Sequence, residues 1–211
     1  MDWVKQGGTL IANNRSTRSI ISNDIGSVKN LNNTFDKSKN FSFDLMREIY
    51  SKEEYIDISD ANVNIVSTEI TYPWETTDIT YSKEELEMRD KWQSTLMPSG
   101  GIVSARADNE HWLTFGTEDV VPVLYGNYPI LMTGGNSEAA LRIGELLPNK
   151  ESETKTINWS QIPSGYDLSV RMSGLVWPEA SQRIANSAYL TREKIGKAVS
   201  YTHLRAHETE A

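Results

Sequence analysis

Apolar and polar residues are arranged differently in three parts of this chain, and the first part contains a short, informative pattern. Trp3 and Val4 precede a pair of glycines, and an apolar run follows at residues 9–12. A glycine in the left-handed conformation commonly ends a helix, and short apolar runs are typical of strands buried in a parallel sheet. The order helix, glycine pair, strand therefore predicts half of an α/β crossover, and we expect sequence upstream of Met1. A short helix should follow over residues 15–25.

The middle part, residues 26–95, is mostly polar, and its first residues are rich in Asn, Ser and Lys. Such a composition is typical of a loop. Beyond that loop the sequence predicts a helix over 42–51, a weak strand over 62–66 and, from a Ser-Lys-Glu-Glu capping box, a second helix over 82–94. We interpret the whole segment as an insertion or lid on an α/β core, and a disordered linker is the alternative.

The remaining part is rich in predicted strands. They cover residues 101–107, 120–124, 129–132, 139–143, 168–175 and 189–193. Tyr125–Tyr128 predict a hairpin turn between the second and third strands, and residues 148–161 predict a polar loop. A short helix opens after Trp177, because Pro178 suits the first helical position and Glu179 suits the positive end of the helix dipole. Trp177 itself is large and apolar, so we expect it to anchor the core.

These patterns divide the chain into four regions. Residues 1–25 form the end of an α/β core, residues 26–95 form the insertion or linker, and residues 96–198 form the strand-rich remainder of the core. Residues 199–211 form a tail. We expect the two core regions to pack together and the insertion to pack less well.

The tail resembles a sequence that was never selected as protein. Residues 199–209 match, over eleven consecutive positions, the translation of a transposase-based sequencing adapter in one reading frame. We therefore interpret 199–211 as artefactual, and a natural polar tail is the alternative. We expect it to make almost no native contacts except backbone pairing of 199–202, which tolerates any sequence, and its deletion should leave stability unchanged. His203 and His207 have the spacing of metal ligands, but they lie inside this string, so we assign them no metal.

Charge and composition exclude several classes of function. The formal net charge is −8, whereas nucleic-acid binding requires clustered Lys and Arg. No apolar run approaches the roughly 20 residues of a membrane helix, and the sequence contains no cysteine. Outside the tail, His111 is the single histidine. We therefore predict no nucleic-acid partner, no membrane span and no cofactor bound by this chain.

Three segments in a fixed order carry a family resemblance: Trp3–Ala12, Asp108–Gly116 and Ser173–Ala180, the last continuing to Glu193–Lys197. They resemble the C-terminal region of large bacterial zinc carboxypeptidase-like proteins of the carboxypeptidase A type. In those proteins a glutamine-amidotransferase-like α/β domain follows the peptidase domain. The resemblance implies an incomplete flavodoxin-like, class I glutamine-amidotransferase-like α/β domain, with a strand-rich C-terminal half and an irregular insertion.

Neither catalytic set can be placed on this sequence. A zinc carboxypeptidase needs a His-x-x-Glu pair and a second His, and an amidotransferase needs a Cys nucleophile activated by His. The resemblance therefore implies a non-catalytic accessory domain, whose partner is the upstream peptidase domain of the same polypeptide and whose parent alone holds zinc. It also implies a secreted or periplasmic parent, whereas the sequence itself does not indicate a subcellular location. The alternative is a ligand- or carbohydrate-binding α/β domain of an unrelated bacterial protein.

The carboxyl end of the first predicted strand is one candidate site. Asn13, Asn14 and Arg15 directly follow the apolar run at 9–12. Ligands of open α/β sheets bind at the carboxyl ends of strands. These three residues therefore predict a vestigial pocket.

The only histidine outside the tail lies in a second candidate group. Glu110, His111 and Trp112 could form an acid/base pair beside an aromatic wall. Adjacent residues of a strand point to opposite faces, however, so the pair would not converge. We therefore predict a structural role for this group, as a hydrogen-bonded turn before Leu113.

Overall fold

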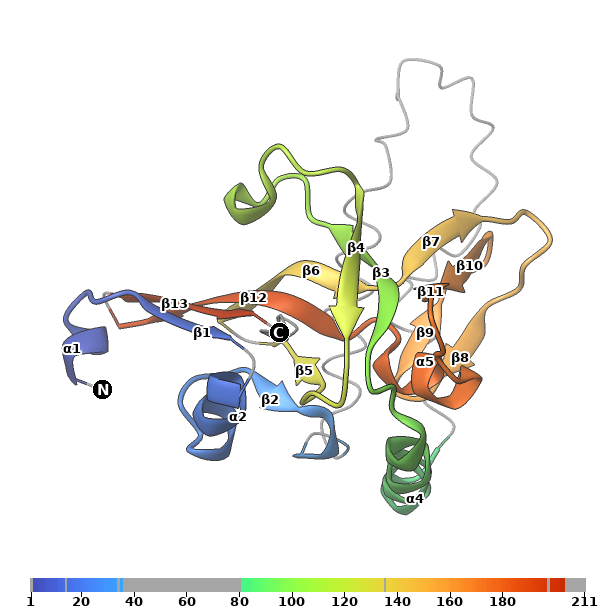
Figure 1. Cartoon of the computed structure of the whole chain (residues 1–211), viewed down its shortest axis with the longest axis horizontal. Coiled ribbons are helices and arrows are strands. Elements are labelled where there is room, and N and C mark those ends of the chain that lie inside the picture. The colour runs from blue at the N-terminus through green and yellow to red at the C-terminus, as the bar shows by residue number, and fades with distance from the viewer. Residues whose placement is uncertain are drawn as a thin grey trace, which may run out of the picture.

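The computed structural model describes residues 2–13, 15–33, 35, 81–134, 136–196 and 198–203. Its main feature is a largely antiparallel sheet that curls into a half-barrel, with few helices around it (Figure 1). The nine strands of this sheet are β1 (Leu10–Asn13), β2 (Lys29–Asn30), β3 (Gly101–Ala107), β4 (Val120–Tyr125), β5 (Leu131–Met132), β6 (Ser137–Ile143), β11 (Arg171–Ser173), β12 (Ala188–Ile195) and β13 (Ala198–His203). Two small antiparallel pairs lie apart from it: β7 (Glu145–Pro148) with β10 (Tyr166–Ser169), and β8 (Lys155–Ile157) with β9 (Ser160–Ile162).

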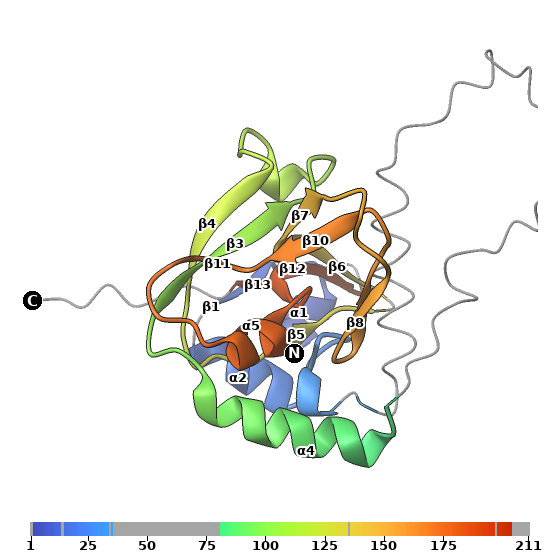
Figure 2. The ribbon, with the colours of Figure 1, turned by 90° about the vertical axis from the view of Figure 1, so that its right-hand side faces the viewer.

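The helices are short. The α-helices are α1 (Asp2–Lys5), α2 (Arg15–Ser22), α4 (Lys83–Gln93) and α5 (Pro178–Ile184), and the 3-10 helices are η1 (Leu31–Asn33), η4 (Ser94–Leu96) and η5 (Trp112–Thr114). α4 contacts α5 and lies along the base of the molecule in Figure 2. In the part of the chain that the structure describes, no helix has the length and apolar character needed to cross a membrane.

The topology of the sheet corrects the predicted fold class. The strand order is β1-β13-β12-β6-β3-β11, β4 pairs with β3, and β5 pairs with both β12 and β2. Among the described strand pairs only β1 and β13 run parallel. The prediction of a flavodoxin-like, amidotransferase-like α/β domain is therefore wrong. Parallel neighbours need a crossover of about a dozen residues or more, usually a helix, whereas β12 and β13 are joined by a tight turn at Gly196.

The first residues form the predicted local elements in a different setting. α1 is followed by Gly7, which has a φ of +119°, and then by β1. Among the described strands β1 pairs with β13 alone, at the end of the strand order, and the side chain of Ile11 is 72% exposed. The helix, the glycine stop and the strand were thus predicted correctly, but the strand is not buried in a parallel sheet.

Part of the predicted insertion belongs to the core. Val28, Leu31 and Phe35 are buried, and they pack in one cluster with residues of β3, β5 and β6. The expectation of poorer packing does not hold for these three residues, because their apolar side chains are buried in the core cluster. The helix predicted over 42–51 and the strand predicted over 62–66 lie outside the described residues.

The predicted capping box at the start of α4 is present. The Oγ atom of Ser82 accepts a hydrogen bond from the Glu85 N–H (3.2 Å), and the Glu85 carboxylate accepts one from the Ser82 N–H (2.8 Å). Two N–H groups that the helix itself cannot satisfy are thereby bonded. This local pattern fixes where α4 begins.

In the strand-rich half, the sequence located strands better than it identified their partners. β4 and β5 flank the predicted hairpin turn, yet β4 pairs with β3, and β5 pairs with β2 and β12. The loop predicted over 148–161 contains part of the β8–β9 hairpin, in which the side chain of Trp159 is buried. The strand predicted over 168–175 is broken at Val170, between β10 and β11.

The backbone of residues 198–203 forms β13, between β12 and β1. This is the backbone pairing that we expected for residues 199–202, extended by one residue. A Cβ atom at Gly196, in the turn before β13, would lie 3.1 Å from the carbonyl oxygen of Lys5. α1 therefore packs closely against this turn. Residues 204–211 lie outside the described part of the chain.

Candidate ligand pocket

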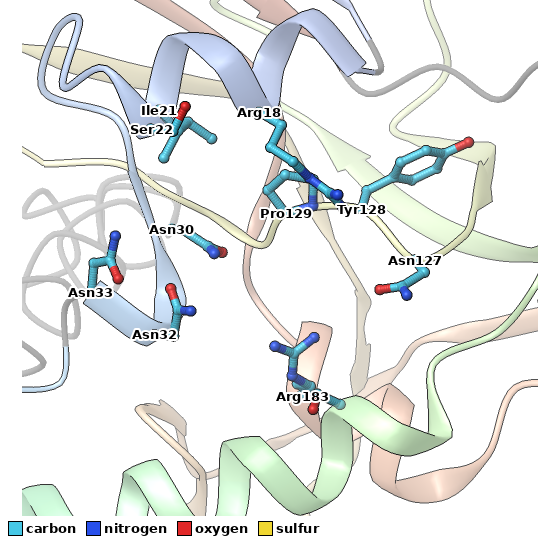
Figure 3. A pocket seen from close by; sticks show the side chains of 11 residues that line it. Arg18, Ile21, Ser22, Asn30, Asn32, Asn33, Asn127, Tyr128, Pro129 and Arg183 are labelled. Carbon is cyan, nitrogen blue, oxygen red and sulfur yellow. The ribbon is translucent and has the colours of Figure 1, made fainter.

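A pocket of about 270 Å³ lies where α2, the β2–η1 segment, the β4–β5 loop and α5 meet (Figure 3). Most of its lining side chains are polar, and they include two arginines, four asparagines and two serines. They are Arg18, Arg183, Asn30, Asn32, Asn33, Asn127, Ser22 and Ser94, and the remaining lining residues are Ile21, Tyr128 and Pro129. Among the described residues, the lining contains two cationic groups and no carboxylate.

α2 supplies one wall of the pocket. Arg18, Ile21 and Ser22 are three and four residues apart, a spacing that places side chains on the same face of a helix. Ile21 is buried, whereas Arg18 is exposed and makes no hydrogen bond or ion pair with another described residue. Figure 3 shows the Arg18 side chain extending from α2 toward Pro129. The wall therefore combines the buried side chain of Ile21 with a guanidinium that no other described residue binds.

Arg183 faces the pocket from α5 and is held by a carboxylate on α4. Its Nε atom donates to Asp90 Oδ1 (2.7 Å), and its Nη2 atom donates to Asp90 Oδ2 (3.3 Å). Arg183 is only 7% exposed. Its Nη1 group donates no hydrogen bond to any described residue, and Figure 3 shows the guanidinium directed into the pocket. One edge of this cation is thus paired, and its other edge is available to a ligand.

Buried amides fix the helices that carry this pair. The Gln93 carboxamide accepts a hydrogen bond from Asn158 Nδ2 (2.8 Å) and donates one to Gln182 Oε1 (3.3 Å). Asn158 Nδ2 also donates to the Gln182 carbonyl (3.1 Å). These hydrogen bonds connect α4, α5 and the β8–β9 turn. They hold α5, and with it Arg183, in a fixed position relative to α4.

Tyr125 lies beside Arg183 as a neutral, buried phenol. Complete burial of its side chain raises the pKa of Tyr125 well above its ordinary value, because burial disfavours the phenolate. The nearby Arg183 charge has the opposite effect on this pKa, but burial is the larger effect. Tyr125 therefore does not neutralise Arg183 at ordinary pH.

The described lining of the pocket offers groups that can bind a ligand. The hydroxyls of Ser22 and Ser94 donate to the carbonyls of Ser19 and Lys91, and no described His, Asp or Glu lines the pocket beside them. Within the described residues, no group of three or more His, Asp or Glu side chains could hold a metal ion. Anion binding is the chemistry that two guanidinium groups support directly.

The pocket does not include the residues that the sequence singled out after the first strand. The Asn13 N–H donates to Ser16 Oγ (3.0 Å), and Ser16 Oγ donates to the Asn13 carbonyl (2.6 Å), so Asn13 takes part in a turn before α2. Asn14 and the side chain of Arg15 lie outside the described part of the structure. The pocket is lined instead by the later turns of α2, and the vestigial pocket at 13–15 stays a prediction.

Glu110, His111 and Trp112 lie in the loop between β3 and β4, which projects from the sheet in Figure 1. The predicted hydrogen-bonded turn is present, because His111 Nδ1 accepts a hydrogen bond from the Leu113 N–H (3.1 Å). Glu110 is exposed, and the carboxylate near His111 belongs to Glu138 (Nε2 to Oε2, 3.4 Å). The group therefore lies in a turn and not on a strand.

The segment Trp177-Pro178-Glu179 opens α5 as predicted. Pro178 occupies the first helical turn, and Glu179 is the acidic residue of that turn. The expectation that Trp177 anchors the core is wrong, since its side chain is 50% exposed. Ala180 and Ile184 bury this helix in its place, because they lie on its inward face.

No signal in the sequence identified the residues that form the pocket. Asp90 and Arg183 are 93 positions apart, so no local spacing connects them. Arg18 shares a helix face with Ile21, and that relation alone was available from the sequence. Asn30, Asn32 and Asn33 lie in a segment whose composition indicated only a loop.

Comparison with known proteins adds no assignment to this geometry. No protein-family model, no curated protein and no solved structure matches the chain. The function therefore has to be inferred from the pocket itself.

Proposed function

We propose that this chain is a non-catalytic binding domain, and that the pocket between α2, the β4–β5 loop and α5 takes a small anionic ligand. The observation that carries this proposal is Arg183, a buried guanidinium with one edge on Asp90 and the other edge directed into the pocket. The free edge of this guanidinium is open to the pocket, so its N–H groups can donate to a ligand there. A bound anion accepts these hydrogen bonds.

The balance of charge favours an anion over a neutral ligand. Asp90 compensates the charge of Arg183, and Arg18 contributes a further positive charge on the opposite wall. A carboxylate or phosphate that accepts hydrogen bonds from both guanidinium groups forms charge-assisted bonds, which are stronger than neutral ones. A cationic ligand would meet the charge of Arg18 and, among the described lining residues, no carboxylate.

An accessory role beside a zinc carboxypeptidase domain is a separate proposal, and it rests on the three resembling segments alone. The third segment, Ser173–Ala180, includes the first turn of α5, the helix that supplies Arg183. The amidotransferase-like fold is no longer part of the proposal. A binding domain of an unrelated protein would use the pocket in the same way.

Thermal unfolding in the presence of simple anions tests the binding proposal. At constant ionic strength, inorganic phosphate in place of chloride should raise the melting temperature, because a ligand that binds only the folded state stabilises it. Arg18→Gln should weaken phosphate binding about tenfold, equivalent to about 1.4 kcal/mol. Arg171→Gln is the matched control, because Arg171 is an exposed arginine on β11 that does not line the pocket. Equal phosphate responses in the two variants, or no response in the unaltered chain, would reject the proposal.

A further inference from the structure

The asparagines of the pocket specify more than an anion. We infer that the ligand is an anionic monosaccharide, a sugar ring bearing a carboxylate or a phosphate; this inference rests on the proposed function. The guanidinium groups account for the charge of such a ligand. The four carboxamides can form hydrogen bonds with its hydroxyls, and the apolar lining can pack against its ring.

The carboxamides approach the pocket from two sides. Asn30, Asn32 and Asn33 come from the β2–η1 segment, and Asn127 comes from the β4–β5 loop (Figure 3). A carboxamide both donates and accepts hydrogen bonds, and so does a hydroxyl. A ligand with several hydroxyls can therefore use both the donor and the acceptor functions of the carboxamides, whereas a carboxylate such as acetate can use only their N–H groups.

Asn30 is held in one orientation by the backbone. Its Oδ1 atom accepts a hydrogen bond from the Ile130 N–H (3.0 Å), which fixes which end of the amide is committed. The Nδ2 group donates to no other described residue. The Nδ2 group of Asn30 is therefore oriented to donate a hydrogen bond to a ligand oxygen.

Ile21, Tyr128 and Pro129 give the pocket an apolar portion. Tyr128 is positioned by an edge-to-face contact with the buried Tyr125, with ring centroids 6.0 Å apart and an interplanar angle of 69°. One face of a sugar ring consists of C–H groups, which pack against such a surface. Simple anions such as phosphate or acetate have no comparable ring face.

The size and lining of the pocket argue against a longer ligand. Its volume of about 270 Å³ lies below the range of about 300–1,000 Å³ that is usual for drug-sized ligands, so a single ring is the fitting scale. An extended peptide is commonly recognised by main-chain bonding to a strand edge. This pocket instead presents side chains, largely from helices and loops.

Calorimetric titration of the full chain separates these ligand classes. The probes are D-glucuronate, D-glucose 6-phosphate, D-glucose, acetate, inorganic phosphate and N-acetylglycylglycine, all at one ionic strength. We expect at least one acidic sugar to bind about tenfold or more tightly than both D-glucose and its matching simple anion. The acidic sugar that does so identifies the anionic group as a carboxylate or a phosphate.

Asn127→Ala should remove most of the difference between the acidic sugar and the simple anion, and leave the affinity for the simple anion within twofold. Asn136→Ala is the control, because Asn136 is an exposed turn residue that does not line the pocket. Equal affinities for acidic sugars and simple anions, or tighter binding of the acetylated dipeptide, would overturn the sugar inference while the anion-binding proposal stands. Failure of every anion to bind would overturn both.

Discussion

Arg183 is accessible to a ligand because a carboxylate from another helix holds it in place. Asp90 and Arg183 form a bidentate pair whose side chains are 10% and 9% exposed, respectively. A buried pair of this kind adds little net stability compared with apolar residues, but removal of one partner leaves an uncompensated charge. The pair therefore positions the guanidinium, and the stability of the α4–α5 contact depends on keeping both partners.

Asp90→Ala should lower the free energy of unfolding by about 3–5 kcal/mol, because it leaves Arg183 buried and unpaired. Urea denaturation monitored by tryptophan fluorescence measures the change. Glu87→Gln provides the comparison, since Glu87 forms an exposed i,i+4 pair with Lys83 at 3.9 Å and should cost less than about 1 kcal/mol. Equal losses in the two variants would show that Asp90 does not compensate a buried charge.

The role of a residue was predictable from the sequence where it depends on a contact with a residue nearby in the sequence. The His111 turn and the position of Pro178 depend on neighbours two or three positions away, and both were predicted. Trp177 was placed in the core on size alone, but burial depends on which face of α5 meets the sheet. Arg183 could not be selected, because Asp90 is distant in the sequence.

At the scale of the elements, one carboxylate fastens the segment before β8 to β10. Asp167, on β10, accepts hydrogen bonds from Asn149 Nδ2 (2.6 Å), Ser152 Oγ (2.9 Å) and Lys155 Nζ (2.6 Å). The Asn149 hydrogen bond, followed by those of Lys155 and Ser152, lowers the pKa of Asp167 from its ordinary 3.8 to about 2. These donors favour the ionised form, so the segment is most firmly held when Asp167 is charged.

The stability of the chain should therefore contain a component that depends on Asp167 at acidic pH. Because the folded-state pKa is depressed, this component is present above about pH 4 and is lost as the pH falls toward 2. Asp167→Asn should lower the melting temperature at neutral pH, and the difference from the unaltered chain should shrink as the pH falls through this window. Thermal melts at several pH values test this expectation, and a difference that does not change with pH would contradict it.

Elements were predictable from the sequence where a local motif marks them. The capping box located the start of α4, and alternation located most of β3, β4, β6 and β12. Which strands pair with one another was not predictable. β4 and β5 are adjacent in sequence, but β4 pairs with β3, whereas β5 pairs with β2 and β12. The β8–β9 hairpin was missed since its residues are largely polar, and the burial of Trp159 depends on contacts that no local pattern reveals.

At the scale of the whole molecule, β13 connects the N-terminal elements to the sheet. β1 pairs with β13 in parallel, and β13 pairs with β12 in an antiparallel register that extends from Ile195–Ala198 to Leu190–His203. α1 contacts the turn at Gly196 that precedes β13. Backbone pairing thus links residues 10–13 to the rest of the fold, and α1 lies against the turn that precedes β13.

Deletion of residues 199–211 tests whether this pairing is part of the native fold. The structure predicts a lower melting temperature, by several degrees, because β1 would lose the one partner strand it has among the described strands. The resemblance of the same residues to an adapter predicts no change. An unchanged melting temperature for the chain ending at Ala198 would show that β13 does not contribute to the native sheet.

The fold class was the main error of the sequence-based prediction, and its cause is physical. A helix, a glycine pair and an apolar strand occur in α/β crossovers, but the same local order also begins a sheet whose other strands are antiparallel. Parallel and antiparallel strands share the same period of two. Their direction is set by the connections between them, and these are mostly turns and loops in the described part of residues 96–198.

The central claim is that a small anion binds between Arg18 and Arg183, and the side-chain amide resonances of the asparagines locate it most directly. We predict that titration of the ¹⁵N-labelled chain with inorganic phosphate at constant ionic strength shifts the side-chain amide signals of Asn30 and Asn127, together with the Nε–H signal of Arg18. The side-chain amides of Asn109 and Asn149, which donate to Asp119 and Asp167 away from the pocket, should not move. Shifts confined to those two residues, or no saturable shift at any pocket residue, would contradict the account.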